Sequence, residues 1–221
     1  MNLTYVIKLL KKSFKISDDD FIAFKLSKQK LNPFEFLIGV ILSQNTSDRN
    51  AIRAFNQLKN LCACKELTPE IFLRIPKDAI KNAIKPAGLH NQRYKTLAEL
   101  AKKLIKINYI EFFKNADPKE VRDFLLSIKG IGYKTVDVFL LMYKEFPTFP
   151  IDTHIRRILK RMGIVKTDNY LKIQEVVSEL LPKEYLLQAH LLLIELGRRL
   201  CNAKKPKCNS CPINNICPKL I

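Results

Sequence analysis

The sequence predicts an all-helical protein, and two observations support that fold class. Apolar residues recur three or four positions apart through most of the 221-residue chain, as at Phe34, Leu37 and Ile41, which is the spacing of one helix face. The same spacing recurs at Leu97, Leu100, Leu104 and at Val121, Phe124, Leu125, Ile128. No alternating strand pattern runs beyond a few residues, and the sequence has no low-complexity segment and no repeat of fixed period.

Two helix starts can be located from their residues. Thr68 precedes Pro69, and Asp117 precedes Pro118, so each places a capping side chain before a proline at the first helical position. We therefore expect helices to begin at these two prolines and the loops between helices to be short.

The charge balance suits a polyanionic partner. Lys and Arg number 39 against 21 Asp and Glu, a formal net charge of +18, which exceeds what solubility alone requires. A lysine-rich solvated surface is the alternative, and charge by itself does not separate the two. No apolar stretch approaches the ~18 residues of a membrane-spanning helix, and the first residues lack a basic region followed by an apolar secretory core. We expect a soluble, intracellular monomer that does not bind membranes.

Two glycines interrupt a run that is otherwise helical from Asp117 to about Tyr143. Gly130 and Gly132 permit a positive φ and a close backbone approach, so the pattern predicts a helix, a glycine hairpin and a second helix. The amides that begin the second helix could then point at an anion such as a DNA phosphate. A simple turn between two helices is the alternative.

Four of the six cysteines lie close together after residue 200. Cys201, Cys208, Cys211 and Cys217 form a Cys-x6-Cys-x2-Cys-x5-Cys run whose thiolates can converge. Such a set binds zinc or an iron-sulfur cluster, and ligand type alone does not separate them. Zinc sites more often have two Cys-x2-Cys pairs with a long spacer, and disulfides are less expected in a chain without a secretory signal. Cys62 and Cys64 stand apart from this run.

The cysteine run and the hairpin together resemble the endonuclease III family of helix-hairpin-helix DNA glycosylases, which carry a four-iron, four-sulfur cluster. The segment Gly132-Tyr133-Lys134-Thr135 is similar to the family's lysine-bearing helix start, and Pro150–Arg157 is similar to the segment with its catalytic aspartate. The resemblance extends from about Pro33 to Pro218. It implies a two-lobed fold with a DNA cleft: a six-helix barrel over 27–146, and a cluster domain formed by 1–26 and 147–221.

The resemblance also implies an activity. The chain would be a bifunctional DNA glycosylase and AP lyase of base excision repair that acts on double-stranded DNA with damaged bases or abasic sites, and its location would be nucleoid-associated. Lys134 would attack the sugar and cut the strand by β-elimination through a Schiff base, and Asp152 would stabilise positive charge on the sugar or cap the helix that follows it. Oxidised pyrimidines are the favoured lesions. The four cysteines would hold the [4Fe-4S] cluster.

Further DNA contacts follow from the same resemblance. The segment 43–48 matches the family's wedge loop, where either Gln44 or Asn45 would fill the gap left by an extruded nucleotide, and Leu89 resembles a second, apolar wedge. Gly130 and Gly132 would contact the backbone. Lysines between the first two cluster cysteines would contact phosphates or form part of the solvated surface: Lys204, Lys205 and Lys207. We expect structural roles for His90, His154 and His190.

Two alternatives remain open at this point. A monofunctional glycosylase of the same fold would remove a mispaired base without cutting the strand, and such relatives typically have serine or tyrosine where this chain has Lys134. A non-catalytic iron-sulfur protein would use the hairpin and the cluster only to bind DNA. The presence of both Lys134 and Asp152 argues against it.

Overall fold

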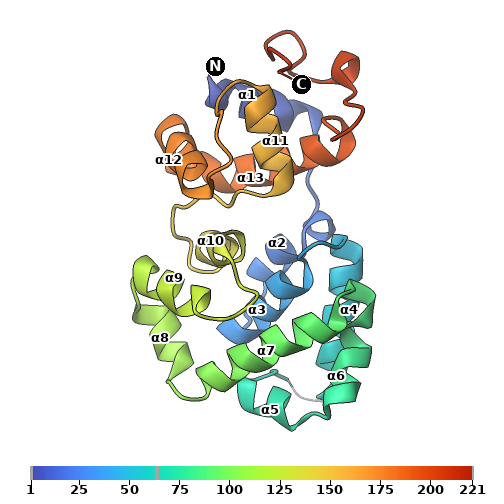
Figure 1. Ribbon diagram of the computed structural model, residues 1–221, viewed down its shortest axis with the longest axis vertical. Helices are drawn as coiled ribbons and strands as arrows, with labels where there is room; N and C mark the ends of the chain where they lie inside the picture. Colours follow the sequence, from blue (N-terminus) through green and yellow to red (C-terminus); the bar gives the residue numbers. More distant parts are fainter. Residues whose placement is uncertain (1, 63–64, 221) are drawn as a thin grey trace. The chain divides into compact units, whose positions relative to one another are not determined.

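The computed structural model describes residues 2–62 and 65–220, and these residues form helices with no strand (Figure 1). The predicted all-helical fold class is confirmed. The chain divides into two compact units. One unit combines the residues up to Ile16 with those from Pro147 onward, and the other contains Ser17–Phe146. Residues 17–26, which we expected to go with the termini, belong to the second of these.

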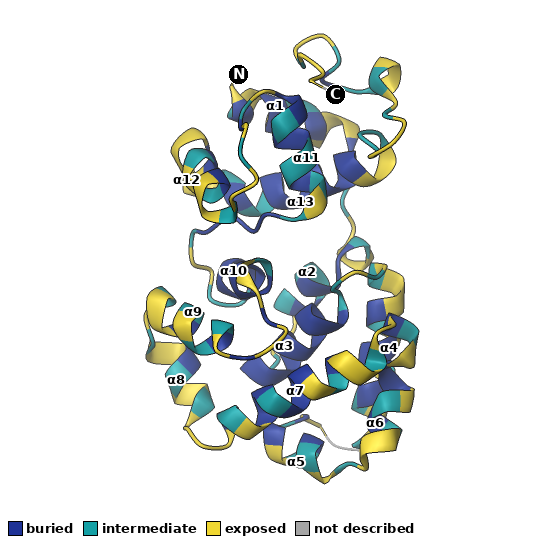
Figure 2. Cartoon of the chain, viewed as in Figure 1, coloured by how far each residue is buried: buried dark blue, intermediate teal, exposed yellow. Residues whose placement is uncertain are grey.

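The unit of residues 17–146 is built around α3. Its helices are α2 (Ile22–Ser27), α3 (Pro33–Leu42), α4 (Asp48–Leu61), α5 (Pro69–Arg74), α6 (Lys77–Ile84), α7 (His90–Leu104), α8 (Tyr109–Asn115), α9 (Pro118–Leu126) and α10 (Tyr133–Met142), with 3-10 turns at Asp18–Asp20 and Lys85–Ala87. Every residue of α3 is buried, and this helix contacts α2, α4, α7, α8 and α10 (Figure 2). Because α3 is apolar on all sides apart from Glu35 in its first turn, it is stable only inside such a ring of helices.

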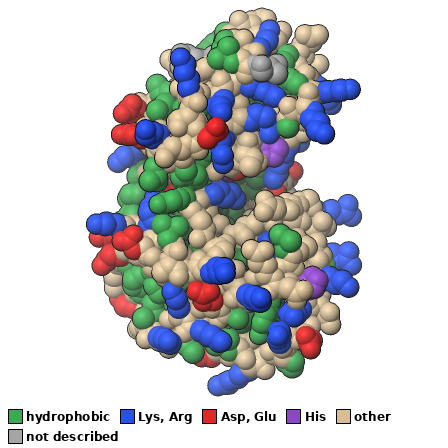
Figure 3. Space-filling model, viewed as in Figure 1, with side chains coloured by type: hydrophobic (Ala, Val, Ile, Leu, Met, Phe, Trp, Pro, Cys, Tyr) green, Lys and Arg blue, Asp and Glu red, His purple; other side chains and the backbone are tan. Residues whose placement is uncertain are grey.

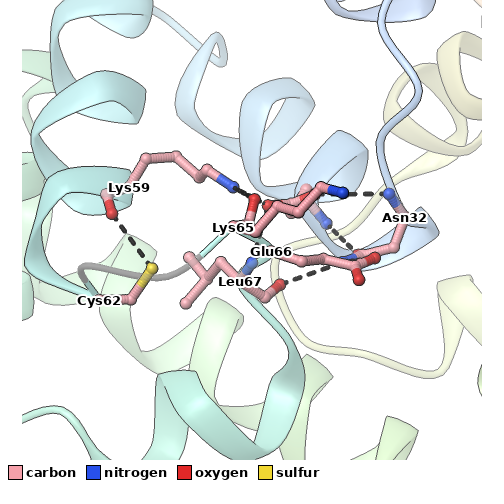
Figure 4. A network of polar contacts seen from close by, with 7 residues as sticks. Asn32, Lys59, Cys62, Lys65, Glu66 and Leu67 are labelled. Atoms are coloured by element: carbon pink, nitrogen blue, oxygen red, sulfur yellow. Dashed lines mark hydrogen bonds and ion pairs between the residues drawn. The ribbon is translucent and has the colours of Figure 1, made fainter.

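A polar network fixes the start of α3 (Figure 4). Asn32 and Glu35 form a capping box, in which the Asn32 side chain accepts a hydrogen bond from the Glu35 amide at 2.9 Å. Glu35 is buried, forms an ion pair with Lys59 and accepts a hydrogen bond from the Leu67 amide at 2.8 Å. The side-chain Nδ2 of Asn32 also donates to the Glu66 carboxylate at 2.9 Å. These bonds compensate the burial of the Glu35 charge.

The predicted helix starts are confirmed. Thr68 accepts a hydrogen bond from the Ile71 amide at 3.4 Å, with Pro69 at the first helical position. The Asp117 carboxylate accepts a hydrogen bond from the Glu120 amide at 2.9 Å, and the Glu120 carboxylate accepts one from the Asp117 amide at 2.9 Å. Both α5 and α9 thus begin where their prolines lie.

The unit that contains both ends of the chain has α13 at its centre. Its helices are α1 (Leu3–Ser13), α11 (Thr153–Arg161), α12 (Tyr170–Leu180) and α13 (Leu186–Arg199), with 3-10 turns at Lys183–Tyr185 and Cys208–Ser210. Helix α13 contacts both α1 and α11. Within α13, His190 is buried, lies 3.1 Å through Nδ1 from the Pro150 carbonyl and packs edge-on against Phe149. His190 therefore has the structural role that we expected, because it holds the segment that leads to Asp152.

No helix in the described part of the chain is long and apolar enough to span a bilayer.

Candidate active site and DNA-contact residues

The predicted hairpin joins α9 to α10, and its two glycines differ. Gly130 has a φ of +95°, and a Cβ atom there would lie 2.3 Å from Thr96 Oγ1. The Thr96 hydroxyl donates to the Lys129 carbonyl at 3.0 Å, so glycine is required for this close approach. Gly132 has an extended backbone with φ of −114°, and no atom lies within 4 Å of a Cβ built on it. Only Gly130 uses the positive φ that both glycines permit, and the fold itself does not require glycine at position 132.

Lys134 is the second residue of α10 and is half-buried. The N-cap of this helix is Gly132, which has no side chain to bond the first amides. An uncapped helix start attracts anions, because its amides and the helix dipole both favour negative charge. The next residue, Thr135, is buried and accepts a hydrogen bond from the Gln44 amide at 3.0 Å. Lys134 thus lies on a helix start that neighbouring loops hold in place.

Asp152 is the N-cap of α11, in the other unit. Its Oδ1 accepts a hydrogen bond from the Ile155 amide at 2.7 Å, which confirms the capping role that we had kept open beside the catalytic one. In the same helix, His154 Nδ1 lies 3.1 Å from an Arg157 guanidinium nitrogen, which agrees with a hydrogen-bonding role for this histidine. The cap bond holds the Asp152 carboxylate in one orientation.

The two candidate side chains of the predicted wedge loop, Gln44 and Asn45, have different surroundings. The Gln44 side chain donates to the Gly130 carbonyl at 3.2 Å and to Thr135 at 3.0 Å, so this amide is bound to the hairpin. Asn45 is exposed and has a φ of +51°. Among non-glycine residues, asparagine tolerates this left-handed conformation best. Of the two candidates, Asn45 is therefore the exposed residue, and Gln44 is the one whose side chain the hairpin holds.

Leu89, the apolar wedge candidate, lies in an unusual conformation. Its side chain is 57% exposed and its φ is +47°, directly after Gly88 with a φ of +75°. A left-handed leucine costs about 1–3 kcal/mol, and such strain is found mainly at functional sites. An exposed, strained leucine gains little from its own fold, so it is suited to contact a ligand.

The four C-terminal cysteines line one cavity. All four thiols are unpaired, and Ile158, Met162, Leu196 and Leu200 supply the apolar part of the wall. Burial raises the pKa of the Cys211 thiol; a hydrogen bond from the Ile213 backbone acts against this, and the nearby thiols of the other three cysteines raise the pKa further.

Two arginines of α11 hold the cysteine loop. Arg161 is buried and donates to Cys201 Sγ at 3.3 Å and to the Asn202 carbonyl at 2.7 Å, and Arg157 donates to the Cys201 carbonyl at 2.8 Å. The described residues contain no group of three or more His, Cys, Asp and Glu side chains placed to hold a metal ion. The donor set of four thiols around one cavity, with a hydrogen bond to a sulfur, nevertheless fits an iron-sulfur cluster.

The lysines of the cysteine loop are all exposed: Lys204, Lys205 and Lys207. Figure 3 shows Lys and Arg spread over the visible surface of each unit, with far fewer acidic side chains. Free lysines on an ordered loop can contact phosphates without loss of other bonds. Their exposure agrees equally with a solvated surface.

Sequence reasoning missed the arginines that support these loops. Arg93, Arg157 and Arg161 donate to backbone carbonyls beside the predicted site residues. Nothing in the sequence distinguishes them among 39 basic residues. Arginine is suited to this task because its planar guanidinium has five donors.

Comparison with known proteins decides the family. Residues 38–183 match the family described as "HhH-GPD superfamily base excision DNA repair protein". An endonuclease III of Sulfolobus acidocaldarius is 36% identical over 209 residues, which cover 94% of this chain and 92% of that relative. The chain belongs to the endonuclease III family. A second endonuclease III, from Rickettsia prowazekii, is 34% identical over 84% of this chain and 83% of its own length.

Solved structures of endonuclease III agree with this placement. A non-covalent endonuclease III–DNA complex matches with a TM-score of 0.78 and 26% identity, over 98% of this chain and 94% of that one. A trapped covalent endonuclease III–DNA intermediate matches with a TM-score of 0.79 at the same identity and coverage. The predicted helix-hairpin-helix glycosylase fold is thereby confirmed for this member of the endonuclease III family.

Proposed function

We propose that this chain excises oxidised pyrimidines from duplex DNA and cleaves the strand 3′ to the resulting abasic site. The combined activity of glycosylase and AP lyase belongs to the endonuclease III family, of which this chain is a member. The observation that carries the assignment to residues is the position of Lys134, which directly follows the glycine hairpin at the start of α10. A nucleoid-associated, intracellular location follows from this proposal, since the substrate is genomic DNA.

Lys134 is the proposed nucleophile. Its amine, once it has lost its proton, forms a bond to C1′ of the sugar as the bond from C1′ to the base breaks. The C1′–O4′ bond of the sugar then breaks, O4′ takes up the proton that the amine releases, and the opened sugar remains joined to Lys134 as a Schiff base. Removal of a proton from C2′ then breaks the bond from C3′ to its phosphate oxygen and expels the 3′ phosphate as the leaving group. The start of α10 places this amine beside amides that favour a phosphate, so binding of the backbone and attack on the sugar use the same helix end.

Asp152 is the proposed electrostatic partner. As the glycosidic bond weakens, positive charge grows on the sugar, and a fixed carboxylate stabilises that state more than the ground state. The hydrogen bond from the Ile155 amide supports this role, because it orients the carboxylate before the substrate binds. A preoriented charge costs no reorganisation during the reaction.

The cysteine loop is the proposed site of a [4Fe-4S] cluster, with Cys201, Cys208, Cys211 and Cys217 as ligands. The cluster would supply a structural crosslink that fixes the loop, and the loop would carry Lys204, Lys205 and Lys207 toward phosphates. The four unpaired thiols, which line one cavity, support this proposal. We likewise propose that the unit of residues 17–146 is the barrel domain and the other unit the cluster domain.

A cleavage assay on duplexes that each contain one lesion tests the proposed function. We expect base removal and strand cutting at oxidised pyrimidines and at abasic sites, with an unsaturated sugar as the 3′ end of the upstream fragment. Duplexes with an intact mismatched base are the control and should stay uncut. Base removal without strand cutting would contradict the lyase assignment and favour a monofunctional glycosylase.

A further inference from the structure

The buried guanidinium of Arg93 joins the two loops that carry the exposed, left-handed residues. Arg93 lies in the first turn of α7 and its side chain is 3% exposed. Its Nε donates to the carbonyl of Gly88, which directly precedes Leu89, at 2.8 Å, and one Nη donates to the carbonyl of Ala87, two positions before Leu89, at 3.1 Å. The other bonds go to the carbonyls of Ile41 and Gln44, the second of which directly precedes Asn45.

These bonds fix the backbone on one side of each wedge candidate. The carbonyl before Leu89 and the carbonyl before Asn45 are held by the same planar group, so the two loops cannot move independently while the bonds last. The Arg93 amide also donates to the Leu89 carbonyl at 2.9 Å, which holds the other side of that residue. All four acceptors of the side chain are backbone carbonyls, so the buried charge is stabilised only while both loops stay in place.

The connection extends to the hairpin. Gln44, whose carbonyl binds Arg93, donates through its side-chain amide to the Gly130 carbonyl and to Thr135. Thr135 adjoins Lys134 in the first turn of α10. Three loops far apart in the sequence are thus tied together through one arginine and one glutamine.

We propose that Arg93 is a positioning residue that holds the Asn45 loop and the Leu89 loop at a fixed separation, so that both side chains enter the duplex together and extrude the damaged nucleotide. This inference rests on the proposed function, since it assumes a nucleotide that must leave the stack. Arg93 acts through the backbone of the two loops and does not touch the substrate. Its loss should therefore impair extrusion and leave the chemistry on an already extruded nucleotide largely intact.

Two variants and a control test this role. Arg93→Lys keeps the charge but has a single nitrogen that cannot reach four carbonyls, and Arg93→Met removes the donors and keeps an apolar stem. Lys102→Met removes one charge from an exposed position of the same helix and serves as the control. Each protein is given a lesion in a fully paired duplex and the same lesion in a looped-out bulge. We expect both Arg93 variants to lose roughly ten- to hundredfold on the paired lesion and the control to match the unaltered protein on both duplexes.

Hydrogen exchange gives a readout that does not depend on activity. The amides of Gln44 and Gly88 donate to the carbonyls of Ile41 and Lys85, so both are protected while their loops are ordered. In the Arg93 variants we expect these two amides to exchange faster together, with α9 and α12 unchanged. Faster exchange in one loop alone, in neither, or uniformly through the chain would overturn the proposal, as would equal losses on paired and bulged lesions. If the unaltered protein excises from neither duplex, the proposed function fails, whereas exchange still decides whether Arg93 couples the loops.

Discussion

At the scale of single residues, Leu89 carries strain that its own fold does not need. It is exposed and has a φ of +47°. Asparagine tolerates this conformation better, so Leu89→Asn should leave the free energy of unfolding unchanged or raise it by up to about 1 kcal/mol. The same change should lower excision of paired lesions by roughly tenfold, because a polar side chain fills the vacated stack poorly. Denaturant melts and single-turnover excision measure both effects, and a less stable variant with full activity would contradict this account.

The two hairpin glycines give a second prediction for individual residues. Gly130→Ala should destabilise the protein by about 1–3 kcal/mol, because it combines a φ of +95° with a clash against Thr96. Gly132→Ala should leave the melting temperature unchanged and weaken DNA binding, since only a close ligand would meet the added methyl group. Calorimetry and fluorescence anisotropy separate the two variants. Unchanged affinity in Gly132→Ala would remove this glycine from the DNA contact.

At the scale of structural elements, the cysteine loop depends on its ligands. Cys208→Ser should give colourless protein that has lost iron and sulfide, because three thiolates hold a cluster poorly. Cys62→Ser is the matched control and should keep both, since Cys62 lies at the end of α4 in the other unit. Iron and sulfide analysis, together with visible absorption spectra, checks both variants. Stoichiometric zinc in the unaltered protein, or cluster loss in Cys62→Ser, would show that the ligand set is wrong.

The sequence predicted the helix starts and the cysteine run better than it predicted the side chains that hold the loops in place. Helix starts at Pro69 and Pro118 follow from local capping chemistry, and the cysteine run is visible as a spacing. The choice between Gln44 and Asn45 required the hairpin, because Gln44 bonds a carbonyl that lies 86 positions further along the chain. Arg93 could not be recognised for the same reason, since its acceptors are backbone carbonyls that carry no residue signature.

At the scale of the whole molecule, the net charge of +18 makes binding to DNA depend on salt. Replacing Lys204, Lys205 and Lys207 by Ala should reduce the slope of log K against log salt by about 2 to 3, because each lost phosphate contact removes about 0.9. A control with Lys8, Lys11 and Lys12 replaced by Ala removes the same charge from α1. Binding titrations at several salt concentrations measure the slopes, and equal slopes in the two triple variants would assign the loop lysines to the solvated surface.

The two proposed catalytic residues belong to different units of the chain, and here the sequence needed the family resemblance. Lys134 belongs to the unit of residues 17–146 and Asp152 to the unit that contains both ends of the chain. No periodicity or spacing reveals that the N-terminal helix groups with residues beyond Pro147. The central claim to test is therefore that Lys134 is the nucleophile and that Asp152 stabilises the positive charge on the sugar.

Borohydride trapping on damaged duplex DNA tests that claim most directly, because it reduces a Schiff base to a stable covalent adduct. The unaltered protein should be trapped, and Lys134→Ala should form no adduct while it retains most DNA affinity, since one charge is small beside +18. Asp152→Asn should still be trapped on a preformed abasic site but excise an intact lesion more slowly by roughly 10²-fold or more. A wild-type level of adduct with Lys134→Ala would contradict the account, because the nucleophile would then be another amine.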